Sequence, residues 1–243
     1  MRFPEPKFHP LGADHFAAVV FLGVLLTFLF VQAWRLGPDH PAVRLQGAAL
    51  GWLTFLSYPF HVLALWISGD LGRTADQLPM HLCNWAGFLT PFALLFRRPL
   101  LVELVYFWGL AGTLQALITP NLFFGFPHPF YFTFFSLHGG VVVAALYLVA
   151  GLKLHPRPGA ALRAWLWLQG YGAVALAINL LSSSNYGFLR QKPARGSLMD
   201  LMGPWPWYLL ALELLALGAF ALLNLPFALL RRRDPSRTHF LPL

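Results

Sequence analysis

The sequence predicts an all-α protein, a polytopic membrane bundle of about seven transmembrane helices. Two observations carry this prediction. The chain has 243 residues, of which 58% are hydrophobic and 11% charged, with a mean hydropathy of +0.61, whereas a soluble domain carries about 25% charged residues. Apolar runs close to the roughly 20 residues needed to cross a bilayer recur along the whole chain. No internal repeat or linker divides it, so we expect residues 1–243 to form a single transmembrane domain.

The predicted spans follow one another through short connections, except for a longer loop over 184–204. Prolines lie at or near the starts of several spans, where a helix tolerates the missing N–H of proline. The first twelve residues lack a basic segment and a cleavage site, so we expect no signal peptide. The seven predicted spans are 14–34, 45–68, 79–96, 99–118, 129–151, 163–183 and 205–230.

The lysines and arginines divide unequally between the two sides of this bundle. Seven spans put the termini on opposite sides. The side with the first, third and fifth loops and the C-terminus carries eleven of the 17. The positive-inside rule then predicts an outside N-terminus and a cytoplasmic C-terminus. The same rule accounts for the formal net charge of +8, so we expect no nucleic-acid partner.

Polar side chains within the spans gather in the half of the bundle predicted to face outside. Polar groups in hydrocarbon are costly, so a cluster of them indicates a functional cavity. A single Asn, Gln or Ser serves equally well as a contact between helices. The inner half is almost wholly apolar, with Glu103 near the boundary. The outer group consists of His61, His81, Cys83, Asn84, Gln115, His138, Asn179 and Glu213.

Cys83 is the only cysteine of the chain, which excludes an internal disulfide and a multi-cysteine metal site. A thiol becomes a strong nucleophile when a nearby imidazole removes its proton. If the third helix begins at Pro79, Cys83 lies in the second turn and His81 points to another face. His138 enters from the same side at a depth that differs by roughly 6 Å, which helix tilt absorbs. His138 is therefore the better candidate base.

The other polar residues have candidate supporting roles. Glu213 reaches a similar depth and is a candidate to orient the imidazole of His138. Asn84 and Gln115 are candidate donors to an oxyanion. We expect no cofactor or metal, because the histidines show no HxxxH or HExxH spacing. A free cysteine is also commonly a small buried hydrophobe, so these residues leave packing and catalysis both open.

Five sequence blocks, in order, carry a family resemblance over about residues 45–230. They are Leu78-Pro-Met-His-Leu-Cys-Asn-Trp85, 108–120, Phe135-Ser-Leu-His-Gly139, 185–193 and 200–208. Together they resemble the YwaF-type family of bacterial integral membrane proteins, which is related to the eukaryotic transmembrane protein 164. The resemblance implies a multi-helix membrane fold similar to that of the androgen-induced lipid hydrolases. For the eukaryotic member it implies a cysteine acyltransferase that moves fatty acyl groups between phospholipids.

The resemblance also implies roles for two residues of this chain. The cysteine of the family matches Cys83, and its histidine matches His138. The androgen-induced relatives use a threonine nucleophile, so Cys83 indicates the acyltransferase branch.

We therefore expect a cysteine-dependent lipid acyltransferase embedded in a bacterial cytoplasmic membrane, with its active site toward the outer side. Phospholipids and lysophospholipids are the expected substrates, and lipid hydrolysis follows if water accepts the acyl group. The alternative is a transporter or a lipid- or small-solute-binding membrane protein without enzymatic activity.

Overall fold

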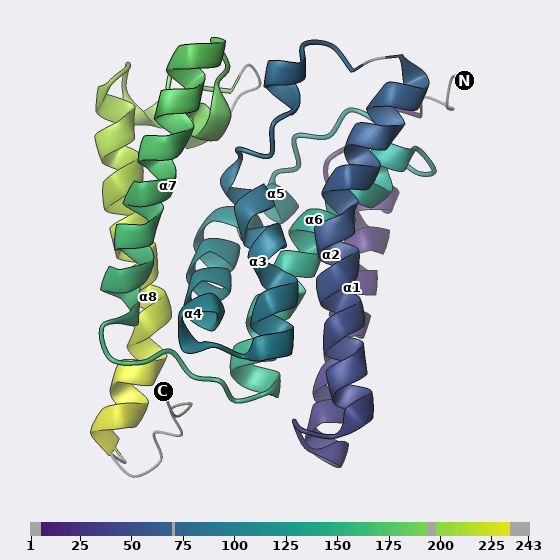
Figure 1. Cartoon of the computed structure of the whole chain (residues 1–243), viewed down its shortest axis with the longest axis vertical. Coiled ribbons are helices and arrows are strands. Elements are labelled where there is room, and N and C mark those ends of the chain that lie inside the picture. The colour runs from purple at the N-terminus through teal and green to yellow at the C-terminus, as the bar shows by residue number, and fades with distance from the viewer. Residues whose placement is uncertain (1–5, 70, 194–197, 234–243) are drawn as a thin grey trace.

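The structure is a computed structural model that describes residues 6–69, 71–193 and 198–233. Seven long helices run side by side along a common direction (Figure 1), which confirms the predicted helical bundle. They are α1 (Ala13–Leu36), α2 (Pro41–Ser68), α3 (Leu82–Phe96), α4 (Pro99–Trp108) continued by η2 (Gly109–Thr113) and α5 (Leu114–Ile118), α6 (Pro129–Leu146) continued by η3 (Tyr147–Gly151), α7 (Ala160–Ser182) and α8 (Trp207–Arg233). Three short helices lie between them: η1 (Thr74–Gln77), η4 (Tyr186–Phe188) and η5 (Leu198–Met202).

Six of the seven long helices are long and apolar enough to cross a membrane, and α3 is shorter. With 15 residues and a rise of about 1.5 Å per residue, α3 spans less than the roughly 30 Å hydrocarbon core. It begins at Leu82, three residues later than predicted. Side-chain hydroxyls of other elements occupy the backbone groups just before it, which keeps this stretch extended. Tyr58 donates to the carbonyl of Gln77, Tyr186 accepts from the N–H of Leu78, and Tyr171 donates to the carbonyl of Met80.

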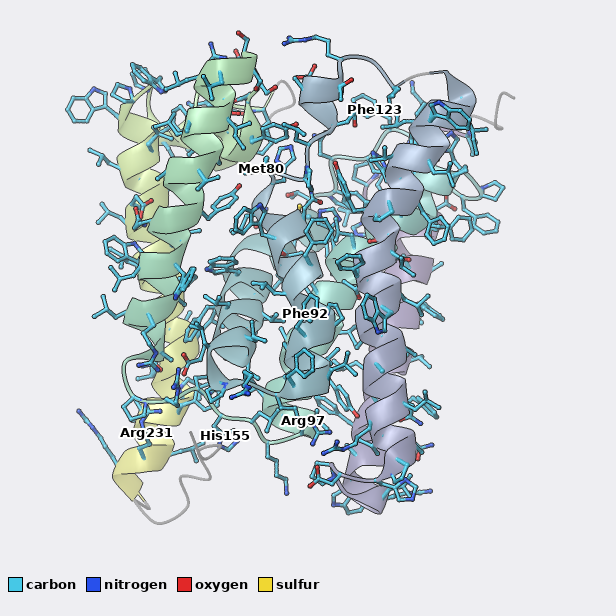
Figure 2. The ribbon with its side chains drawn as sticks, viewed as in Figure 1. Met80, Phe92, Arg97, Phe123, His155 and Arg231 are labelled. Carbon is cyan, nitrogen blue, oxygen red and sulfur yellow. The ribbon has the colours of Figure 1, made fainter. Side chains whose placement is uncertain are left out.

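The two ends of the bundle differ in character. Successive helices alternate in direction, so α1 begins and α8 ends at opposite ends (Figure 1). We call the end with residues 37–40, 97–98 and 152–159 the basic end, and the end with η1 and η4 the cap end. Figure 2 shows Arg97, His155 and Arg231 at the basic end, and Met80 and Phe123 toward the cap end. Which end faces the cytoplasm stays a prediction.

Helix α6 is the centre of the bundle, because α1, α2, α3 and α4 all pack against it. Two of its glycines allow this close approach. A Cβ on Gly139 would lie 2.5 Å from Leu22 of α1. A Cβ on Gly140 would overlap Oγ1 of Thr54 in α2 and lie 3.0 Å from its Cβ. These two glycines therefore let α1 and α2 pack closely on α6.

Helix α3 is packed equally tightly between α2 and α6. A Cβ on Gly51 of α2 would lie 2.6 Å from Cα of Pro91 in α3. A Cβ on Gly87 of α3 would lie 2.5 Å from Leu137 of α6. Between membrane helices, such contacts replace the hydrophobic driving force that acts in water. The trio α2, α3 and α6 therefore sets the relative heights of the residues it carries.

Glu103 joins three segments at the basic end. Its side chain is 1% exposed and accepts three hydrogen bonds from Arg157, in the α6–α7 connection, and two from Arg163 in α7. These bonds hold the pKa of the Arg157 guanidinium above its usual range. A buried carboxylate without such partners would be strongly destabilising, which explains an acidic residue at this depth.

The half of the bundle nearer the basic end also contains buried polar atoms. Gln46 Oε1, Tyr147 Oη and Asn224 Oδ1 are buried without a hydrogen-bond partner in the described part of the chain. The structure thus corrects the prediction that this half is almost wholly apolar. Tyr147 was not counted as polar in the sequence analysis, because its ring is apolar and only its hydroxyl group is polar.

The Gly140 contact leads to a stability prediction. We expect Gly140→Ala to lower the unfolding temperature of the purified protein by several degrees, because the new methyl group collides with Thr54; overpacking of this kind costs about 1–3 kcal/mol. Gly218→Ala in α8 is the matched control, since nothing lies within 4 Å of a Cβ there. Equal unfolding temperatures for the two variants in a fluorescence melt would refute the importance of this contact.

Candidate functional site

Cys83 is the second residue of α3 and lies in its first turn, not in the second turn as predicted. Its side chain is half-buried. The sulfur lies next to the backbone N–H groups of Cys83 and Asn84. The N-terminus of a helix carries a partial positive charge that stabilises anions. The helix end therefore offsets only part of the cost of placing a charged sulfur in these buried surroundings.

His81 precedes α3 and has an extended backbone, with φ −77° and ψ 146°. The prediction that it points to another face of the same helix is therefore wrong, since it is not in the helix. Its ring packs against Tyr186, with the ring centroids 5.1 Å apart, and against Phe188 at 6.0 Å. His81 thus connects the start of α3 with η4.

His138 is held by its own helix in a defined tautomer. Its Nδ1 lies 2.8 Å from the carbonyl oxygen of Phe134, and its ring centroid lies 4.2 Å from that of Phe134. A carbonyl only accepts, so Nδ1 must carry the hydrogen, and Nε2 of the neutral ring keeps its lone pair. Within the described residues Nε2 makes no hydrogen bond. This is the arrangement that a general base requires.

Helices α3 and α6, which carry Cys83 and His138, pack against each other. Gly87 lies one turn after Cys83 on the same face of α3, and this face contacts Leu137, the neighbour of His138. Both helices begin toward the cap end (Figure 1). Helix side chains lean toward the start of their own helix, and the bond to Phe134 shows that His138 does so. The imidazole of His138 therefore points toward the cap end.

Three histidines gather at this level from separate segments. His61 of α2 and His81 are near enough to His138 to interact with it electrostatically. His61 Nδ1 also lies 3.3 Å from Thr133 Oγ1, and its ring is 4.7 Å from that of Phe130. In the described part of the chain, no group of three His, Cys, Asp or Glu side chains has the geometry to hold a metal ion.

The two candidate oxyanion donors have different surroundings. Asn84 is 5% exposed and follows Cys83 in the first turn of α3, and its amide is not one of the buried, unpartnered groups named above. Its position next to Cys83 keeps it a candidate oxyanion donor. Gln115 is exposed, and its Nε2 donates to Thr119 Oγ1 at 2.8 Å. Of the two, only Asn84 is both buried and adjacent to the cysteine.

Asn179 fastens a loop over the site. Its side chain is fully buried; Nδ2 donates to the carbonyl of Tyr186 at 2.9 Å, and Oδ1 accepts from the N–H of Tyr186 at 2.7 Å. The hydroxyl of Tyr186 donates to the carbonyl of Ala75 at 2.6 Å and accepts from the N–H of Leu78 at 2.8 Å. These bonds join η1 to η4, and we call this joined unit the cap. Asn179 thus holds Tyr186 in place, and Tyr186 in turn packs on His81 at the start of α3.

The phenol of Tyr186 remains neutral at ordinary pH. Burial raises its pKa, and the nearby carboxylate of Asp76 raises it further, although the bond from the N–H of Leu78 opposes both. A neutral hydroxyl is required here because it donates one hydrogen bond and accepts another.

Glu213 lies on α8 and its carboxylate bonds to α7. Among the described residues it makes no hydrogen bond to His138. Its Oε2 accepts from Trp165 Nε1 and from Gln169 Nε2, both at 2.9 Å. The orienting partner of Nδ1 in His138 is the carbonyl of Phe134. A main-chain carbonyl carries no sequence signature, so side-chain patterns had no means of suggesting it.

Tyr171 is a residue near the cysteine that the sequence patterns missed. It projects from α7, donates to the carbonyl of Met80 at 2.9 Å, packs against Trp85 at 5.7 Å, and lies close enough to Cys83 to interact with it. An aromatic residue in an apolar span looks like ordinary packing, so its hydroxyl gave no separate signal. Helix α7 thus reaches the site through this side chain.

Two shallow hollows on the described surface lie away from these residues. One, of about 570 Å³, is lined only by residues of α1, between Val20 and Val31. The other, of about 560 Å³, lies along the outer face of α2 and includes Tyr58 and Gln77. Neither is lined by Cys83 or His138.

The fold and these residues define a polytopic helical membrane protein with a cysteine at a helix N-terminus and a histidine on the neighbouring helix. Comparison of the sequence with protein families gives a match over residues 10–224. The chain belongs to the TMEM164 family, which confirms the resemblance drawn from the sequence blocks. No curated protein and no solved structure matched the chain.

The double bond between Asn179 and Tyr186 leads to a second prediction. We expect Asn179→Leu, which keeps the branched shape but lacks the hydrogen-bonding groups, to destabilise the cap, because each buried backbone group left unpaired costs about 1–3 kcal/mol. Hydrogen exchange should increase in residues 184–190. Gln115→Leu serves as the control, since its exposed hydrogen bond contributes little; equal exchange in both variants would contradict the role of Asn179.

Proposed function

We propose that the chain is a membrane-embedded, cysteine-dependent lipid acyltransferase in which Cys83 is the nucleophile and His138 the base. The observation that supports this most directly is the bond from Nδ1 of His138 to the carbonyl of Phe134, because it leaves Nε2 as the basic nitrogen. Membership of the TMEM164 family agrees with the proposal. The amide of Asn84, the residue after Cys83, is the candidate donor to the negative charge that forms during acyl transfer.

In the first half-reaction, Nε2 of His138 takes the proton from the thiol of Cys83. The thiolate attacks the ester carbonyl of a phospholipid, and the amide of Asn84 donates to the resulting oxyanion. When this intermediate collapses, the carbon–oxygen bond of the ester breaks. The departing alkoxide takes the proton from His138, which releases a lysophospholipid and leaves the acyl group as a thioester on Cys83.

In the second half-reaction, a lysophospholipid hydroxyl gives its proton to His138 and attacks the thioester. The carbon–sulfur bond breaks, the thiolate of Cys83 recovers the proton, and a new diacyl phospholipid leaves. Water in place of the lysophospholipid would release a free fatty acid, which is lipid hydrolysis. Transfer is the favoured outcome where the site is dry, and the apolar surroundings of α3 and α6 support this.

The location that we propose is a bacterial cytoplasmic membrane, with the cap end outside. Ten of the 17 lysines and arginines lie in the connections and adjoining helix ends of the basic end, and the positive-inside rule places such an end in the cytoplasm. The substrates would then be lipids of the outer leaflet. The cap covers the start of α3 from the aqueous side, so we propose that lipids enter sideways from the bilayer.

Acyl transfer by Cys83 leads to a direct prediction. The purified protein, incubated with acyl-labelled phospholipid, should gain the mass of one acyl group, measured on the intact protein. Cys83→Ala should abolish this adduct and the exchange of acyl groups between lipids. His138→Gln should slow thioester formation by roughly 10²–10⁴-fold, the usual contribution of a general base.

Two further variants make this experiment specific. Asn84→Ala should slow thioester formation by about 10²–10³-fold, as expected for the loss of one oxyanion donor, whereas Gln115→Ala should react at the normal rate. Acyl exchange at the wild-type rate in Cys83→Ala would disprove the proposal. Tight lipid binding without any adduct would instead favour the non-enzymatic lipid-binding alternative.

The proposed orientation is tested by thiol labelling in intact cells. Because Cys83 is the only cysteine, Cys83→Ser gives a background without thiols. In this background, Thr74→Cys, exposed at the cap end, should react with a membrane-impermeant maleimide. Arg44→Cys, exposed at the basic end, should react only after the cells are opened. The reverse pattern would overturn the orientation.

A further inference from the structure

Three arginines from different segments converge at the basic end on residues 156–158. Arg157 belongs to this stretch, Arg163 of α7 donates from Nη1 to the carbonyl of Pro158 at 2.8 Å, and Arg231 of α8 donates from Nη1 to the carbonyl of Pro156 at 3.0 Å. Arg231 lies near His155 at this end in Figure 2. We call these three arginines the arginine cluster. It joins the α6–α7 connection, the start of α7 and the end of α8.

The cluster carries more positive charge than its acidic partner neutralises. Glu103 already accepts five hydrogen bonds from Arg157 and Arg163, whereas a carboxylate offers about four lone-pair sites. It therefore has no room for Arg231. Three guanidinium groups and one carboxylate leave a surplus of two positive charges. Arg232 and Arg233, which follow Arg231 in α8, bring two further positive charges to this end.

Several donors of the cluster remain available. Nη1 of Arg157 and both Nε and Nη2 of Arg231 make no hydrogen bond to the described residues. The side chains of Arg157 and Arg163 are 26% and 35% exposed, respectively, so a ligand can reach them. Guanidinium groups match the geometry of phosphate oxygens and bind them through paired hydrogen bonds.

Exposed leucines flank the arginines on the same two helices. Leu162 and Leu166 of α7 are 59% and 55% exposed, and Leu229 and Leu230 of α8 are 48% and 54% exposed. The arginines at the ends of α7 and α8 thus lie next to exposed leucines of the same helix, which can face lipid. A soluble phosphate would use only the first of these features, whereas a phospholipid would use both.

We propose that the arginine cluster binds the phosphate group of an anionic phospholipid in the leaflet at the basic end. Basic pockets between membrane helices at the cytoplasmic side are suited to anionic head groups. The lipid phosphate would bridge Arg231 and Arg157, and its acyl chains would lie along the exposed leucines of α7 and α8. This site is separate from Cys83 and does not rest on the proposed acyl transfer.

The test uses the full chain in detergent micelles, with phosphatidylglycerol and phosphatidylcholine as probes and native mass spectrometry to measure bound lipid. The wild-type protein should bind phosphatidylglycerol in preference to phosphatidylcholine. Arg231→Gln, which leaves all five bonds of Glu103 in place, should weaken phosphatidylglycerol binding about fivefold, the effect of removing one arginine near a lipid surface. Arg44→Gln removes the same charge at the same end but outside the cluster, and should change binding less than twofold.

Three outcomes would overturn the proposal. Equal losses in Arg231→Gln and Arg44→Gln would show general surface attraction instead of a site. Competition by soluble glycerol phosphate at the concentration of the lipid would assign the cluster to a free phosphate. Arg231→Lys keeps the charge but lacks the paired donors of a guanidinium. Phosphatidylglycerol binding between that of the wild type and that of Arg231→Gln, at an unchanged unfolding temperature, supports the proposal, whereas binding equal to that of the wild type contradicts the paired hydrogen bonds.

Discussion

The contact between Thr54 and Gly140 is the constraint on which the rest of the structure depends. Membrane helices gain little from hydrophobic association, so close van der Waals contact must hold them. The hydroxyl of Thr54 is satisfied within its own helix, by the carbonyl of Leu50 at 2.8 Å. The side chain therefore brings no unpaired polar group into the contact. With α2 and α6 locked at this height, α3 fits between them through Gly87, and Cys83 and His138 acquire their relative positions.

The requirement to satisfy backbone polar groups explains where α3 begins. In and near hydrocarbon, an unpaired N–H or carbonyl costs several kcal/mol, so an extended stretch needs partners from elsewhere. Tyr58, Tyr171 and Tyr186 supply them for the residues before Leu82. Their apolar rings pack in the bundle while their hydroxyls bind the backbone. As a result, α3 starts beside Cys83, and the positive end of this helix lies at the candidate site.

The two ends of the bundle use polar groups differently. At the cap end, neutral hydrogen bonds through Asn179 and Tyr186 fasten a cover over the start of α3. At the basic end, a buried carboxylate binds two arginines and leaves positive charge in excess. The first arrangement suits the exclusion of water from a reaction, and the second suits contact with anionic head groups. The chemistry and the lipid anchorage that we propose thus occupy opposite ends of one bundle.

The sequence by itself determined the seven helices, because hydrocarbon thickness and hydropathy act locally. All seven begin within four residues of the predicted starts. Cys83 and His138 were also proposed as a candidate pair from the sequence, by residue chemistry and family resemblance. Only the tertiary structure decided that Phe134 orients His138, that Tyr171 reaches the residues around Cys83, and that Glu103 binds two arginines. Each of these depends on which atoms meet when distant segments pack, and neither hydropathy nor spacing carries that information.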